Sequence, residues 1–351
     1  YTNGHYYDAR KKIVLGQDDF LPINDTLAIN KNAAPFKRMF DEGNMAIIQG
    51  IGYPNSNRSH FRGMDIWHTC EPDRVGSEGW LGLAVKEIDP SGENVLTGVN
   101  IGQGLPRAMA VAGVPVTSIS DLEGYGVMKR LEQEQLREKA LKAFKDIYGQ
   151  AIGSGVVAEY IGKTGLDVLR GADMLSEVAG NYNSTVEYAD NTIAKSLRDV
   201  ARIHLSGLGT RIFYTSHGGY DTHANEMPAH PKLISDLSGA VSDFMDDLEE
   251  HEAADDIVIL VFTEFGRRMR DNGSGTDHGS GGGAFIFGKN VKGGLYSEYP
   301  SLDPANWEHG EDLQHTIDFR GIYGTVLEQW LQLEAKPIVK GGFEQISPFY
   351  L

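Results

Sequence analysis

Short apolar runs alternate along the chain with longer stretches of helical periodicity. Three runs have the composition of buried strands, and a turn rich in glycine and polar residues follows each one. They lie at residues 45–49, 211–214 and 257–263. Apolar residues recur at helical spacing over residues 232–250. This alternation predicts an α/β fold, and the last two runs with the helix between them predict a βαβ unit with a right-handed crossover.

The pattern changes over residues 120–206, where apolar positions follow a helical period. Helices are predicted over residues 128–148, about 156–184 and 191–206, with charged residues on the opposite faces. This block interrupts the strand-rich parts of the chain. It predicts a helical insertion in a single domain that covers residues 1–351.

Composition restricts the classes of function. A hydrophobic content of 40% supports a packed core, and a formal net charge of −17 argues against a nucleic-acid partner, which requires a basic surface. The only cysteine, Cys70, excludes an internal disulfide and a cluster of zinc-bound thiolates. No apolar run reaches about 18 residues, so no membrane span is predicted.

Carboxylates and imidazoles follow two of the predicted strands. Asp221 and His223 follow Gly218-Gly219, Glu264 follows the strand at 257–263, and Asp277-His278 lies in a loop between Gly275 and Gly279. Loops that leave the carboxyl ends of parallel strands meet at one edge of a sheet, so we expect these side chains to lie together. A mixed carboxylate and imidazole set suits zinc, manganese or iron better than calcium. One or two divalent ions are predicted.

Each of these residues also has a structural interpretation. Asp221 is typical of a turn that caps the following helix. Glu264 has potential ion-pair partners in Arg267 and Arg268, and Asp277-His278 is compatible with a solvated loop.

The strand at 45–49 leads into Tyr53-Pro-Asn-Ser-Asn-Arg-Ser-His60, which offers nucleophiles and cations near a helix start. Ser59 and Ser56 are the candidate nucleophiles, because free N–H groups at a helix N-terminus attract anions. Arg58 and Arg62 are suited to bind a phosphate or sulfate. Ser59 is equally typical of a helix N-cap, and His60 of a ligand, a base or a plain helix residue.

Four motifs resemble a known family: Tyr53-Pro-Asn-x-Asn-Arg-Ser-His-Phe-Arg, Gly218-Gly-Tyr-Asp-Thr-His-Ala-Asn, Thr263-Glu-Phe-Gly-Arg-Arg and Asn272-Gly-Ser-Gly-Thr-Asp-His-Gly. They are similar to those of the bacterial domain-of-unknown-function family fifteen-oh-one, which in turn resembles the alkaline phosphatase and sulfatase superfamily. The resemblance implies a three-layer fold around a central, mostly parallel sheet. It also implies a nucleophile at a helix start and one or two metals held by Asp and His.

Carried over residue by residue, the resemblance makes Asp221, His223 and His278 ligands of one metal. Glu264, with Asp277, would face a second metal, and Ser59 would attack, with Ser56 as the alternative. Members of the family usually begin with a segment of the Gly-Gly-x-Asp-Gly-Leu-Asn type, whose Asp would bind the second metal, and this chain opens just after the corresponding point. Members often carry a twin-arginine export signal, so we expect a periplasmic or extracellular location.

The expected activity is therefore metal-dependent hydrolysis of phosphate or sulfate esters through a serine. The expected substrate is a small anionic ester or a sulfated or phosphorylated glycan. The alternative is a noncatalytic relative that keeps the fold for binding or surface assembly. The metal content of the protein, and the effect of a chelator on ester hydrolysis, distinguish the two.

Overall fold

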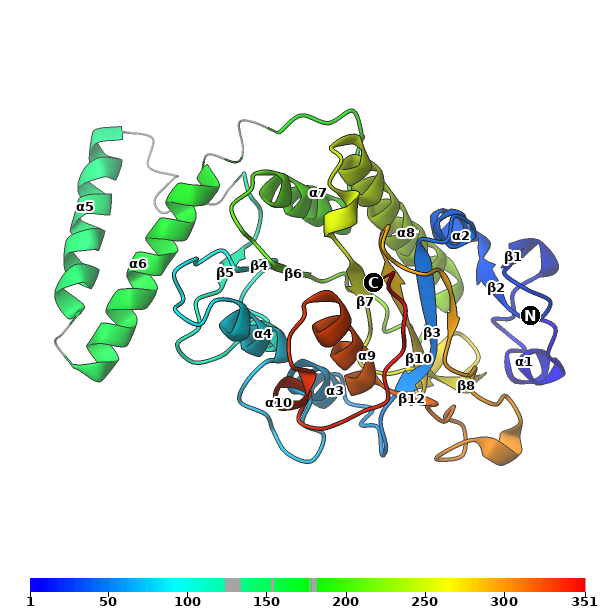
Figure 1. The fold of residues 1–351 in the computed structure, drawn as a ribbon. Coiled ribbons are helices and arrows are strands. Elements are labelled where there is room, and N and C mark those ends of the chain that lie inside the picture. Colours follow the sequence, from blue (N-terminus) through cyan, green and yellow to red (C-terminus); the bar gives the residue numbers. More distant parts are fainter. Residues whose placement is uncertain (124–133, 153–154, 177, 179–181, 351) are drawn as a thin grey trace. The chain divides into compact units, whose positions relative to one another are not determined.

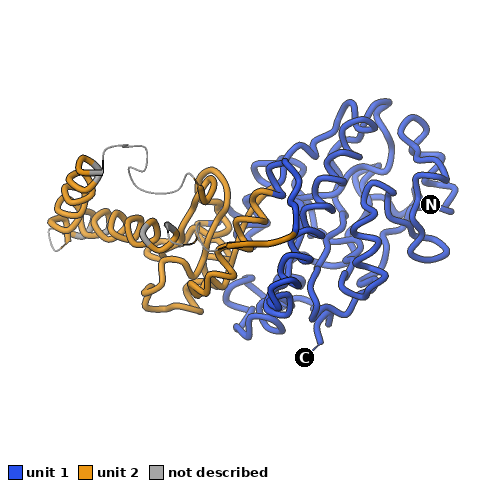
Figure 2. Tube along the Cα trace, turned by 90° about the horizontal axis from the view of Figure 1, so that it is seen from above, with its two compact units in different colours: residues 1–76, 186–194, 217–351 blue, residues 77–185, 195–216 orange. Residues whose placement is uncertain are grey.

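The computed structural model of the chain describes residues 1–123, 134–152, 155–176, 178 and 182–350. The chain forms two compact units (Figure 2). Unit 1 consists of residues 1–76, 186–194 and 217–351, and unit 2 of residues 77–185 and 195–216. Both units combine helices with strands, which confirms the predicted mixed α/β class (Figure 1).

The main sheet of unit 1 is built around β3 (Met45–Gly52), which is buried along almost its whole length. The strand order is β11-β3-β10-β7, and β12 also pairs with β3. β10 runs antiparallel to both β3 and β7, whereas β11 and β12 run parallel to β3. The partner strands are β7 (Ile259–Val261), β10 (Gly282–Phe287), β11 (Gly294–Tyr296) and β12 (Ile317–Asp318).

Aromatic side chains pack helices of unit 1 against the sheet and against one another. Phe36 of α2 (Ala34–Asp41) lies against Phe287 of β10, with ring centroids 4.6 Å apart. Trp67 of α3 (His60–Thr69) stacks on Phe319 of α9 (Phe319–Thr325) at 4.4 Å. Trp67, Phe287 and Phe319 are all fully buried. Because α3 is held by this core, the side chain at its first residue has a fixed position.

The remaining elements of unit 1 surround this sheet. α8 packs against α2, and α1 lies against β8. Two small antiparallel pairs, β1–β2 and β8–β9, stand apart from the main sheet. These elements are α1 (Gly4–Ala9), β1 (Phe20–Pro22), β2 (Ala28–Asn30), α8 (Glu226–Glu250), β8 (Arg267–Asp271), β9 (Thr276–His278), a π-helical turn (Val326–Trp330) and α10 (Ala335–Val339).

Unit 2 has a parallel sheet of three strands in the order β5-β4-β6, and a pair of long helices that pack on each other, α5 and α6 (Figure 1). α7 begins in unit 1 and continues into unit 2. The elements are α4 (Trp80–Ile88), β4 (Gly98–Ile101), β5 (Thr117–Ile119), α5 (Glu134–Ala151), α6 (Val156–Ser176), α7 (Thr192–Leu205) and β6 (Ile212–Thr215). The predicted helical stretch thus contains α5, α6 and α7, although residues 128–133 of its first helix lie outside the described residues.

The expected central, mostly parallel sheet differs from the observed one. β6 pairs with β4 in unit 2, and β7 pairs antiparallel with β10 in unit 1, so the described strands do not form the predicted βαβ unit. The chain returns through the β8–β9 pair directly into β10, which pairs with β7. An apolar run reports burial but not the direction of its partner strand, so this pairing was not visible in the sequence.

Two further observations concern the helices. α8 begins at Glu226, six residues before the predicted start, and contains Pro231 within its early turns. Pro231 is the sixth residue of α8, beyond the four N–H groups that have no partner within a helix, so it removes one i→i−4 hydrogen bond. Among the described residues, no helix combines the length and the hydropathy needed to cross a membrane.

Candidate metal centre

His60 connects two acidic side chains of unit 1. It is the first residue of α3, directly after the N-cap residue Ser59. Its Nδ1 lies 2.6 Å from Oε1 of Glu264, and its Nε2 lies 3.1 Å from Oδ2 of Asp221. An ionised carboxylate only accepts hydrogen bonds, so the short contact fixes the ring proton on Nδ1.

His278, at the end of β9, has the same arrangement. Its Nδ1 lies 2.7 Å from the backbone carbonyl oxygen of Arg58, which can only accept. Its Nε2 lies 2.8 Å from Oδ1 of Asp221. The proton of this ring is therefore also on Nδ1, and Nε2 faces the carboxylate of Asp221.

His223 repeats the pattern a third time. Its Nδ1 lies 2.8 Å from Oδ1 of Asp277. Its Nε2 lies 3.0 Å from Oδ1 of Asp221 and 3.0 Å from Nε2 of His278. Two ring nitrogens and a carboxylate oxygen at such distances need a proton or a metal cation between them, because their lone pairs otherwise repel one another.

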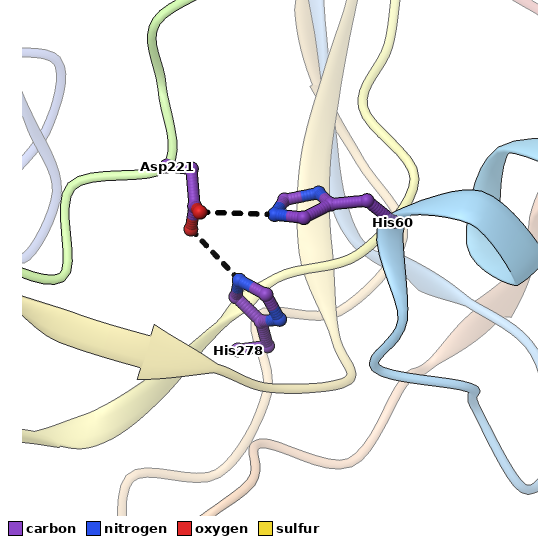
Figure 3. A group of neighbouring side chains, drawn as sticks. All are labelled: His60, Asp221 and His278. Carbon is purple, nitrogen blue, oxygen red and sulfur yellow. Dashed lines mark hydrogen bonds and ion pairs between the residues drawn. The ribbon is translucent and has the colours of Figure 1, made fainter.

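The three imidazoles thus share one orientation toward Asp221. Each donates its Nδ1–H to an acceptor and presents Nε2, the orientation that metal-binding histidines take in proteins. His60, Asp221 and His278 each offer one donor atom within 4.8 Å of the others, a group that could hold a metal ion (Figure 3). His223 approaches the same group through Asp221 and His278.

Arg267 of β8 also binds Asp221, at the oxygen that His223 and His278 contact. Its Nη2 lies 3.0 Å from Oδ1 of Asp221 and also donates to the carbonyl of Tyr220, while Nη1 donates to the carbonyl of Thr276. Desolvation acts to raise the pKa of Asp221, but hydrogen bonds from His278, Arg267 and His60 bring that pKa well below its ordinary value. Asp221 is therefore ionised and held in a fixed position.

Glu264 and Asp277 each form a hydrogen bond with a histidine ring, and these bonds shift pKa values. The bond with Glu264 raises the pKa of His60, and the bond with His223 lowers the pKa of Asp277. Glu264 also accepts from Thr263 through Oε2, and Asp277 accepts from Asn272. The two carboxylates expected to face a second metal thus contact the Nδ1 side of the imidazoles.

The predicted nucleophiles differ in access. Ser59 is exposed, and although it occupies the N-cap of α3, its side chain makes no capping hydrogen bond. Ser56 is buried, 9% exposed, beside the hydroxyl of Tyr53. Only Ser59 therefore has a hydroxyl available at the surface near the start of α3.

The predicted anion-binding arginines also differ. Arg62 forms an ion pair with Asp65, and its Nη2 donates to the carbonyls of Glu71, Pro72 and Arg74. Arg58, in contrast, lines a pocket of about 240 Å³ together with His223, Arg268, Asp277 and His278. Sequence reasoning treated Arg268 only as a partner for Glu264, whose observed partner is His60.

Arg267, Arg268 and Asp312 are the residues of this region that sequence reasoning did not assign to the site. The adjacent arginines directly after Glu264-Phe265-Gly266 are a signal in the sequence. Asp312 gave none, because it lies in an irregular segment far along the chain.

A known family model matches only part of the chain, and the candidate site residues lie both inside and outside the matched segment. Residues 71–338 match the family model described as "Protein of unknown function (DUF1501)". The matched segment contains Asp221, His223, Glu264, Asp277 and His278, whereas Ser56, Arg58, Ser59 and His60 precede it. No curated protein and no solved structure matches the chain. Since the match covers most of its length, the chain belongs to the DUF1501 family of proteins of unknown function.

Proposed function

We propose that the protein is a metal-dependent hydrolase that cleaves phosphate or sulfate esters through a serine nucleophile. His60, Asp221 and His278 would hold the ion, with His223 as a further donor. Glu264, Asp277 and the carbonyl of Arg58 would orient the three rings. Imidazole nitrogen combined with a single carboxylate favours zinc, with manganese or iron as alternatives.

One observation carries this proposal. Three separate histidines have their Nδ1–H groups engaged by acceptors, and all three direct Nε2 toward the same carboxylate. Without a cation, the contacts with Asp221 need protons on Nε2. A divalent cation bound among the three Nε2 atoms and this carboxylate would replace those protons with four favourable contacts.

A bound divalent ion would polarise the ester and lower the pKa of a hydroxyl that attacks it. Ser59 Oγ, exposed beside His60, would form a bond to phosphorus or sulfur while the ester oxygen leaves with a proton. Water would then hydrolyse the serine ester, releasing phosphate or sulfate and restoring the hydroxyl. The free N–H groups at the start of α3 would favour the charge of the anion.

Metal analysis and chelation test the proposal. We expect purified protein to bind a transition metal stoichiometrically, and we expect a strong chelator to abolish hydrolysis of aryl phosphate, phosphodiester or aryl sulfate substrates. Adding back zinc should restore it. His278→Ala should lose the metal, and His5→Ala, a change at an exposed histidine of α1, should not. A protein that stays metal-free after reconstitution and hydrolyses none of these esters would leave the noncatalytic alternative.

The two serines are tested against each other. Ser59→Ala should lower kcat by several orders of magnitude while metal content stays unchanged, because only the attacking group is removed. Ser56→Ala removes a buried hydroxyl and should retain metal and most of the turnover. The opposite ranking of the two variants would transfer the nucleophile to Ser56.

A further inference from the structure

Two guanidinium groups border the pocket beside the histidines. Arg58 comes from the loop between β3 and α3, and Arg268 from β8, so residues far apart in the sequence meet there. Their side chains are 37% and 30% exposed, which leaves part of each group open to solvent. Like charges repel, so their proximity requires a compensating group.

Asp312 is that group. Its side chain is fully buried, with Oδ2 at 3.5 Å from Nη1 of Arg58 and Oδ1 at 3.5 Å from Nε of Arg268. Ser280 donates to Oδ2 at 3.2 Å, and the backbone of Asp312 exchanges hydrogen bonds with Glu308. One carboxylate thus spans two arginines, each on a different oxygen.

The two arginines lie among several carboxylates. Besides Asp312, Glu311 lies 3.6 Å from Arg268, and Asp277 also lines the pocket. The guanidinium donors, rather than a surplus of positive charge on the protein, therefore suit the site to an anion. A buried carboxylate is costly unless it is paired, and here the pairing holds two cations side by side. A guanidinium has five N–H donors, so most of those on Arg58 remain available after its contact with Asp312.

We infer that Arg58 and Arg268, held in position by Asp312, form a binding site for a tetrahedral oxyanion, the phosphate or sulfate group of the ester. This inference rests on the proposed function, because it assigns the two arginines to the charged group of the substrate of the proposed hydrolase. Arg268 takes the role expected of Arg62, whose donors are occupied by Asp65 and three carbonyl groups. Asp312 acts as a positioning residue.

The size of the pocket limits what it accepts. A volume of about 240 Å³ is below the ~300–1,000 Å³ of pockets that enclose whole drug-sized ligands. The site is therefore large enough for a phosphate or sulfate group, and its open side leaves room for the rest of the ester. Paired arginines match the geometry of a phosphate or sulfate oxygen pair better than a lysine does.

Direct titration tests this binding site without relying on turnover. Inorganic phosphate, sulfate and acetate are titrated calorimetrically into the metal-loaded protein, and metal content is measured in each sample. We expect phosphate or sulfate to bind and acetate to bind more weakly. Arg268→Ala should weaken binding of the tetrahedral anion at least about tenfold with metal content unchanged, because one charge-assisted contact is lost.

Further variants separate positioning from folding. Arg268→Lys should restore part of the anion affinity, since it keeps the charge but loses the fork. Asp312→Asn should weaken the anion affinity and raise KM for an ester more than it lowers kcat. Arg170→Ala serves as control, because Arg170 lies on α6, pairs with Asp167 and does not line the pocket.

Two failures are distinguishable. Unchanged anion affinity in both Arg268→Ala and Arg58→Ala overturns the binding site, even where metal and hydrolysis are normal. Absence of metal in the wild-type protein overturns the proposed hydrolase, while arginine-dependent anion binding to the same protein still supports the site.

Discussion

Asp221 in unit 1 and Asp199 in unit 2 are both fixed by several partners, but the partners differ in kind. Asp199 on α7 is buried, and its oxygens accept from the backbone N–H of Leu122 at 2.9 Å and from Nη1 of Arg202 at 3.2 Å. Asp221 is 44% exposed and faces one arginine and the Nε2 atoms of three imidazoles.

The difference separates a carboxylate that pairs within a buried network from one that lies in a candidate metal centre. Around Asp199, the contacts described above pair a donor with an acceptor, so the group is satisfied by the protein itself. Around Asp221, three imidazole nitrogens converge on one carboxylate, an arrangement that could hold a metal ion. Burial raises the pKa of Asp199, whereas the hydrogen bonds of His278, Arg267 and His60 lower that of Asp221.

The largest expected effect comes from removing the shared carboxylate. Asp221→Asn should lose the metal, because the carboxylate whose two oxygens face the three rings loses its negative charge. Its melting temperature should no longer rise when zinc is added, although ligand binding should raise that of the wild type. The unfolding free energy of the metal-free protein should change by less than about 1 kcal/mol, as is typical of partly exposed ion pairs.

Asp199→Asn is the matched control for that experiment. The same chemical change in unit 2 should leave metal content and the zinc-induced rise in melting temperature intact. Zinc loss in Asp199→Asn, or full zinc retention in Asp221→Asn, would break the comparison between the two aspartates.

A smaller effect is expected one contact further out. Glu264→Gln keeps a side chain of the same shape but weakens its hold on His60 Nδ1, so metal affinity should fall by about 10- to 100-fold. Competition with a chromogenic zinc chelator measures this. Glu42→Gln, at an exposed position following α2, should have no effect. A loss as complete as that of Asp221→Asn would make Glu264 a direct ligand, as the sequence first suggested.

The smallest effect concerns pH and unit 2. Burial raises the folded-state pKa of Asp199 above its unfolded value of about 3.9. Its contribution to stability is therefore fully present below about pH 3.9 and is lost as the pH rises through the folded-state pKa. The unfolding free energy of wild type minus that of Asp199→Asn should increase as the pH is lowered from 7 to 4. Urea denaturation at several pH values measures this difference, and a decrease would contradict it.

Much of the candidate site could be predicted from the chain alone, because it depends on local order. The apolar runs that became β3 and β7, and the helix that became α8, carried their own periodicity. Side chains suited to metals follow these strands, and Asp221, His223, Glu264, Asp277 and His278 do lie within one cluster. The family assignment rested on motifs of the same local kind.

The partners of each group were decided only by tertiary structure. β10 returns antiparallel to β3 and β7, and no run of apolar residues encodes that direction. Glu264 and Asp277 contact ring Nδ1 atoms, and Arg62 is occupied by a neighbouring loop while Arg268 reaches the pocket. Residue type determines which hydrogen bonds a side chain can form. Only the folded chain determines which acceptor lies within 3 Å of which ring nitrogen, and that distance distinguishes a metal ligand from a residue that orients the ligand.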